Sequence, residues 1–64
     1  MEPKIYTKIK KICAERKISV ASIERELDLP NGMISKWDLA VPLATNLRMV
    51  AEYLGVSMEY LMEE

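Results

Sequence analysis

Residues 18–37 read ISVASIERELDLPNGMISKW, and most signals that settle the architecture of the chain lie in this stretch. Ser19 is a preferred helix N-cap residue, because its hydroxyl oxygen can accept a hydrogen bond from an otherwise unpaired N–H group. Ile23 and Leu27 follow at a spacing that places both side chains on one face of a helix. These features predict a helix over about 19–27.

The tripeptide Asp28-Leu29-Pro30 predicts the end of this helix, because a residue that precedes proline is disfavoured in the helical region. We expect another helix over about 31–38, with Ile34 and Trp37 facing the core. Two short helices joined by a tight turn form a helix-turn-helix arrangement.

Helical patterns continue on both sides of this stretch. Ile5, Ile9 and Ile12 form an apolar stripe, Gly55 is typical of a helix end, and Ser57 can cap a last helix. No segment shows the sustained alternation of a strand. The sequence therefore predicts an all-α fold in a single domain, 1–64. Its five expected helices cover about 3–16, 19–27, 31–38, 43–54 and 57–62.

The composition excludes several classes of protein. The chain has one cysteine and no histidine, so it predicts no internal disulfide, no metal site and no cofactor. Cys13 is expected to be a small buried hydrophobic residue, and its free thiol is typical of a cytoplasmic protein. No apolar run approaches the roughly 18 residues of a membrane span. Without a glycine-rich phosphate loop or a base for its serines, the chain is predicted to be neither an enzyme nor a receptor for a small-molecule substrate.

Charge is unevenly distributed along the chain, although the net charge is only −1. Residues 1–17 contain six basic and two acidic side chains, whereas residues 18–64 contain three basic and eight acidic ones. The first predicted helix is therefore basic, and residues 19–38 contain two cations against four carboxylates. Because affinity for DNA depends largely on neutralised phosphates, a monomer is expected to bind DNA weakly.

Three groups of residues resemble a known family, the Cro/repressor-type (XRE family) helix-turn-helix domains of phage and bacterial regulators. The resemblance covers about residues 5–62 and implies a compact five-helix lambda-repressor-like fold. It also implies a sequence-specific, double-stranded DNA-binding transcriptional regulator that acts as a homodimer on operator half-sites. The matching residues are Ile18-Ser19, Leu27-x-Leu29-x-Asn31-Gly32-x-Ile34-Ser35-Lys36-Trp37 and Val50-Ala51-Glu52-Tyr53-Leu54-Gly55-Val56-Ser57-x-Glu59-Tyr60-Leu61.

In this family the first residues of the second helix of the motif contact base edges in the major groove. Carried over to this chain, the reading positions are Asn31, Gly32, Ser35 and Lys36, with Pro30 at the helix start. Phosphate contacts are expected from Ser19 at the start of the preceding helix, and from Lys8, Lys10 or Lys11. The alternatives are a simple helix-start signal for Asn31-Gly32 and a solvated helix face for the lysines.

The loop after this motif departs from the family pattern. Relatives commonly have polar residues here and a serine cap after the proline, where this chain has Leu43. If the family fold applies, Leu39, Val41, Leu43 and Met49 form an exposed apolar patch, unless some of them turn into the core. We interpret the patch as a self-association or partner surface. The alternative function is a protein-interaction module, natural or engineered, with weak or lost DNA binding.

Overall fold

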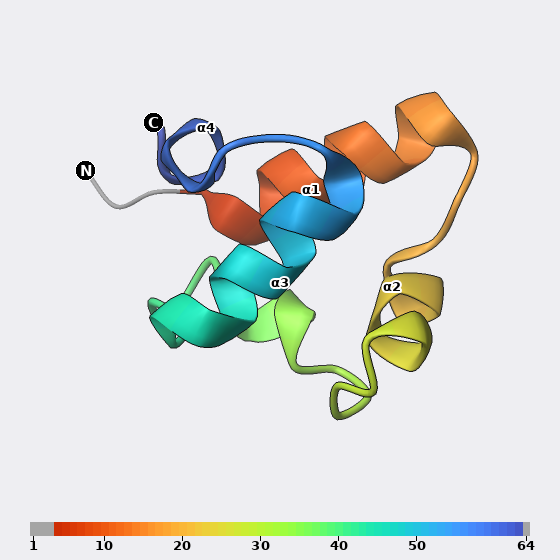
Figure 1. Ribbon diagram of the computed structural model, residues 1–64, viewed down its shortest axis with the longest axis horizontal. Coiled ribbons are helices and arrows are strands. Elements are labelled where there is room, and N and C mark those ends of the chain that lie inside the picture. Colours follow the sequence, from red (N-terminus) through yellow and green to blue (C-terminus); the bar gives the residue numbers. More distant parts are fainter. Residues whose placement is uncertain (1–3, 64) are drawn as a thin grey trace.

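The computed structural model describes residues 4–63, and these residues form a compact all-helical structure without strands (Figure 1). The prediction of an all-α protein is confirmed. The expected start of the first helix at Pro3 lies outside the described residues. In chain order the elements are α1 (Ile5–Arg16), α2 (Val20–Glu26), the 3₁₀ helix η1 (Ile34–Lys36), α3 (Ala44–Leu54) and α4 (Met58–Met62).

The helix ends follow the local signals in the sequence. The Ser19 hydroxyl accepts a hydrogen bond from the Ser22 N–H at 3.1 Å, and the Ser57 hydroxyl accepts one from the Tyr60 N–H at 3.0 Å. Gly55 ends α3 in the left-handed conformation, with φ of 72°. The predicted caps of α2 and α4 and the predicted end of α3 are therefore confirmed.

The prediction of a full helix over 31–38 is wrong: the described residues form four α-helices, and this segment holds only η1. Gly32 has a φ of 88°, a conformation that a right-handed helix cannot contain. A helix can therefore start only after Gly32. The short remainder forms i→i+3 bonds, such as that from the Trp37 N–H to the Ile34 carbonyl at 3.0 Å.

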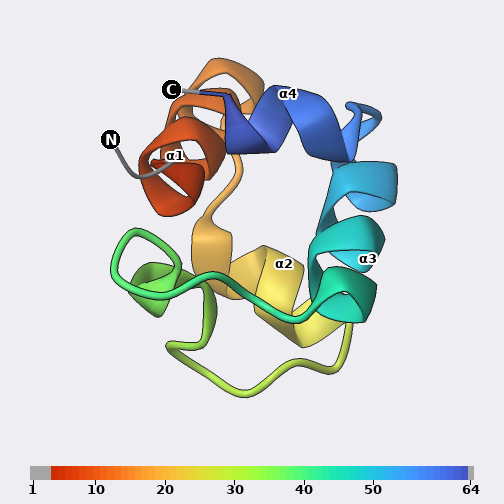
Figure 2. The ribbon, with the colours of Figure 1, turned by 90° about the vertical axis from the view of Figure 1, so that its left-hand side faces the viewer.

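The core draws apolar side chains from all five elements and their connections. Trp37 and Cys13 are buried, as expected from the sequence. Helix α1 packs against α4, α2 and η1, and α3 packs against α4 (Figure 2). The turn after α2 and the loop before α3 both lie below α1 and α4 in that view. The buried apolar residues are Ile5, Ile9, Ile12, Cys13, Ile23, Ile34, Trp37, Leu47, Val50, Ala51, Leu54 and Leu61.

Candidate nucleic-acid interface

A buried carboxylate connects α2 with the turn that leads into η1. Glu24 lies on α2 and is only 4% exposed. Its Oε1 accepts a hydrogen bond from the Gly32 N–H at 3.1 Å, and its Oε2 accepts one from the Ile34 N–H at 2.9 Å. These two charge-assisted bonds satisfy backbone donors at the start of η1 and fix its position relative to α2. The sequence pattern around Glu24 gives no sign of this role.

Residues 30–36, called the reading segment below, run as successive turns. The Met33 N–H donates to the Pro30 carbonyl at 3.2 Å, and the Lys36 N–H donates to the Met33 carbonyl at 3.2 Å. The Ile34 side chain is completely buried, and Trp37 directly follows the segment in the core. The apolar anchors thus hold one side of the segment against the protein and leave its other side in solvent.

The residues predicted to read bases lie mainly on the solvent side. Pro30, Asn31, Ser35 and Lys36 are exposed, and Gly32 is half-buried with open space where a Cβ atom would lie. The Ser35 hydroxyl donates a hydrogen bond to the Gly32 carbonyl at 2.7 Å, so its proton is directed inward. The segment therefore presents an amide, a hydroxyl oxygen and an ammonium group within six residues.

An open depression of about 450 Å³ lies between α2 and the turn that follows it. Asn31 forms one side of this depression, and the charged side chains of Arg25 and Asp28 border it. Both of these side chains are exposed. The surface beside the reading segment is therefore concave and carries charges of both signs.

Ser19 and the lysines of α1 differ in how available they are. The Ser19 oxygen accepts the Ser22 N–H, so that backbone donor is already occupied, but the Ser19 hydroxyl proton can still be donated to a phosphate. Lys10 and Lys11 are exposed, although the Lys10 ammonium lies 4.7 Å from the centroid of the Tyr6 ring. Lys11 extends from the exposed surface of α1 and is the least restricted of these groups.

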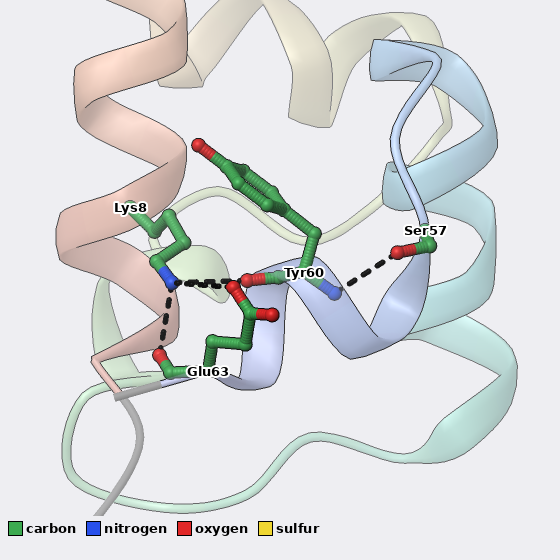
Figure 3. A network of polar contacts seen from close by, with 4 residues as sticks. All are labelled: Lys8, Ser57, Tyr60 and Glu63. Carbon is green, nitrogen blue, oxygen red and sulfur yellow. Dashed lines mark hydrogen bonds and ion pairs between the residues drawn. The ribbon is translucent and has the colours of Figure 1, made fainter.

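Lys8, in contrast, is bound within the chain (Figure 3). Its ammonium donates hydrogen bonds to the Tyr60 and Glu63 carbonyls, both at 3.0 Å. It also lies 4.9 Å from the Tyr60 ring centroid and 4.0 Å from the Glu63 carboxylate. A cation at the C-terminal end of a helix interacts favourably with the carbonyls there, and the Tyr60 carbonyl also accepts the Glu63 N–H at 3.4 Å. Lys8 therefore connects α1 with α4, and a phosphate contact would have to replace these bonds.

Asp38 has an equally specific role that the sequence did not reveal. Its carboxylate accepts hydrogen bonds from the Thr7 hydroxyl at 2.6 Å and from the Thr7 N–H at 3.2 Å. It thereby caps the start of α1, where Lys4 provides no side-chain cap. Desolvation raises the pKa of Asp38, but the bonds from Thr7, the Tyr6 N–H and the charge of Lys4 together hold this pKa below its usual value.

The loop that follows Asp38 is apolar and exposed. Leu39 is 84% exposed, Val41 is 68% exposed and Leu43 is 71% exposed. Met49, on α3, is 38% exposed. None of these four side chains belongs to the core, so the loop after Asp38 and the exposed side of α3 present large apolar groups to water.

No family model, curated protein or solved structure matches this chain. Across the described part of the chain, no group of histidine, cysteine, aspartate and glutamate side chains could hold a metal ion. No helix within residues 4–63 has the length and apolar character needed to cross a membrane.

Proposed function

We propose that this protein is a sequence-specific, double-stranded DNA-binding transcriptional regulator with a lambda-repressor-like fold that acts in the cytoplasm. The observation that carries the proposal is the anchored reading segment, which exposes Asn31, Ser35 and Lys36 directly after a helix-turn-helix turn. In helix-turn-helix proteins the N-terminal residues of the second helix contact bases. Here η1 begins at Ile34, so Ser35 and Lys36 lie within that element and Asn31 lies in the turn before it.

The chemistry of the exposed groups suits the major groove. The Asn31 amide can form two hydrogen bonds with adenine, and the Lys36 ammonium can reach O6 and N7 of guanine. Because the Ser35 proton is directed to the Gly32 carbonyl, its oxygen acts as an acceptor for the amino group of adenine or cytosine. The reading segment thus supplies both donors and acceptors from a backbone that Glu24 holds in place.

Electrostatic attraction is the weak part of this interface. Arg25 and Lys36 are the cations of the motif, and the exposed carboxylates of Glu26 and Asp28 oppose them. Adding Lys10 and Lys11, the exposed lysines of α1 that are predicted to contact phosphates, gives four cations. Each neutralised phosphate contributes roughly −0.9 to the slope of the logarithm of the binding constant against the logarithm of the salt concentration. A monomer should therefore show a slope no steeper than about −4.

The test is selection from a random duplex library at low salt, followed by titration of the selected sequence. We expect a defined consensus of a few base pairs, and we expect Asn31→Ala to lose preference at one position. Lys36→Ala should lower both affinity and preference. Failure of the unmodified protein to bind any duplex at low salt and high protein concentration would refute the proposal.

Arg48→Gln is the matched control for the loss of one positive charge. Arg48 pairs with Glu52 at 3.3 Å and is two residues after Asn46, whose amide contacts the Met33 sulfur at 3.8 Å. Two residues correspond to about 200° around a helix, so Arg48 lies on the side of α3 that faces away from the reading segment. If Arg48→Gln and Lys36→Ala reduce affinity equally on all sequences, Lys36 does not read bases.

A further inference from the structure

The most exposed large apolar side chains of the described structure lie together on one loop. Residues 39–43, called the apolar loop below, contain Leu39, Val41 and Leu43, with exposures of 84%, 68% and 71%. The other exposed large apolar side chains of residues 4–63 are at most 42% exposed. Apolar surface gathered on one short loop is a candidate for an interaction site, and its charge and size indicate what it can bind.

The backbone of the apolar loop is held at both ends. Before it, Asp38 is bonded to Thr7 of α1, and the Leu39 N–H donates to the Lys36 carbonyl at 3.0 Å. After it, the Leu43 carbonyl accepts the first intrahelical bond of α3, from the Leu47 N–H at 3.0 Å. Pro42 restricts the backbone between these anchors. The apolar groups are therefore presented by an ordered framework, which lowers the entropic cost of binding.

The local charge indicates the partner. In a chain with 30% charged residues, residues 39–47 contain none. Close to a two-fold axis each side chain meets its own copy, so a charge there would meet a like charge. A neutral patch avoids that repulsion, and it offers no attraction to an acidic or basic partner. We propose that the apolar loop is a self-association surface that binds a second copy of this chain about a two-fold axis.

The size of the patch indicates a weak dimer. A Leu or Val side chain carries on the order of 100 Å² of apolar surface, so the three side chains supply roughly 200 Å² per copy. A standard interface buries about 800 Å² per partner. The loop therefore forms the centre of a small interface, and each leucine at that centre contributes much of the affinity. Removing one leucine from both copies should raise the dissociation constant about tenfold or more.

The test is sedimentation of the full chain from micromolar to millimolar concentration. Leu43→Ser is the main variant, because serine suits the N-cap position of α3 and the fold should survive. Leu39→Ser gives a second measurement within the same loop. Ile18→Thr is the matched control: Ile18 is 36% exposed and lies in the α1–α2 connection, away from the loop before α3 (Figure 1).

We expect the unmodified chain and Ile18→Thr to dimerise equally, and we expect both serine variants to dimerise about tenfold or more weakly. A chain that stays monomeric at millimolar concentration would overturn the proposal. Equal weakening by Ile18→Thr would also overturn it, because association would then not depend on the apolar loop. The outcome is independent of DNA binding, since no duplex is present in the experiment.

Discussion

Leu43→Ser should make the monomer more stable although it removes a large apolar side chain. Helices α2 and α4 begin with serine caps, whereas α3 begins with Leu43 and has no side-chain cap. The Leu43 backbone already has the required conformation, with φ of −61° and ψ of 143°, close to the −81° and 156° of Ser57. A serine hydroxyl at this position could therefore accept the Asn46 N–H without any change of the backbone.

The size of the effect follows from two contributions. A serine N-cap in place of an aliphatic residue stabilises a protein by about 1 kcal/mol. The opposing loss of apolar burial is small, because Leu43 is 71% exposed. For a domain of 60–100 residues, about 1 kcal/mol corresponds to a rise in Tm of roughly 4–8 °C.

The assay is thermal and urea unfolding followed by circular dichroism at several protein concentrations, with Leu43→Ala as the control. Leu43→Ala removes the same apolar surface without adding an acceptor, so only Leu43→Ser should gain stability at high dilution. At high concentration the unmodified chain should gain Tm through dimerisation, and the serine variant should gain less. Equal stability of the serine and alanine variants at high dilution would refute the capping argument.

Other contacts make three further predictions. Asp38→Ala should lower the free energy of unfolding by about 1 kcal/mol at neutral pH. Because folding lowers the pKa of Asp38, this stabilisation is present above about pH 4 and is lost as the pH falls through the folded-state pKa. Urea unfolding of the variant and of the unmodified protein should therefore converge in acid. Lys8→Met keeps the apolar stem of the side chain but removes the ammonium that bonds the Tyr60 and Glu63 carbonyls. Amide hydrogen exchange should therefore accelerate in α4 more than in α2. Unchanged exchange in α4 would contradict the contact. Burial raises the pKa of the Cys13 thiol, and the charge of Arg16 opposes this with a smaller effect. A thiol reagent at neutral pH should therefore react with Cys13 only as fast as the protein unfolds. Rapid labelling of the native protein would disprove this.

Features with local causes could be predicted from the sequence. Ser19 and Ser57 form their cap bonds within three residues, and Gly55 ends α3 through its own backbone conformation. The apolar spacing of Ile5 and Ile9 likewise identified the buried face of α1. Each of these signals is complete within one helical turn or repeats along one helix, so the pattern alone is sufficient.

Contacts between distant residues could not be predicted in this way. Glu24 bonds to backbone groups eight and ten residues later, and Asp38 bonds to Thr7 across 31 residues. Lys8 reaches carbonyls 52 and 55 residues away. In the sequence these three side chains are ordinary charges. Only the tertiary packing places each one beside the backbone groups that it bonds. The length of η1 has a similar cause, because Gly32 permits but does not require a left-handed conformation.

The proposed DNA contact of Lys36 and the proposed dimer contact of Leu39 constrain each other, because the two residues are close together in the chain. Three residues span at most about 11 Å. With a two-fold axis through contacting Leu39 side chains, two such spans and the two side chains would hold the two Lys36 backbones within roughly 30 Å. Half-sites one helical turn apart require about 34 Å. An axis nearer Leu43, seven residues beyond Lys36, allows a reach of up to about 25 Å on each side, which is compatible with this spacing. A dimer that binds successive half-sites must therefore depend more on Leu43 than on Leu39, whereas a dimer centred on Leu39 would exclude such binding.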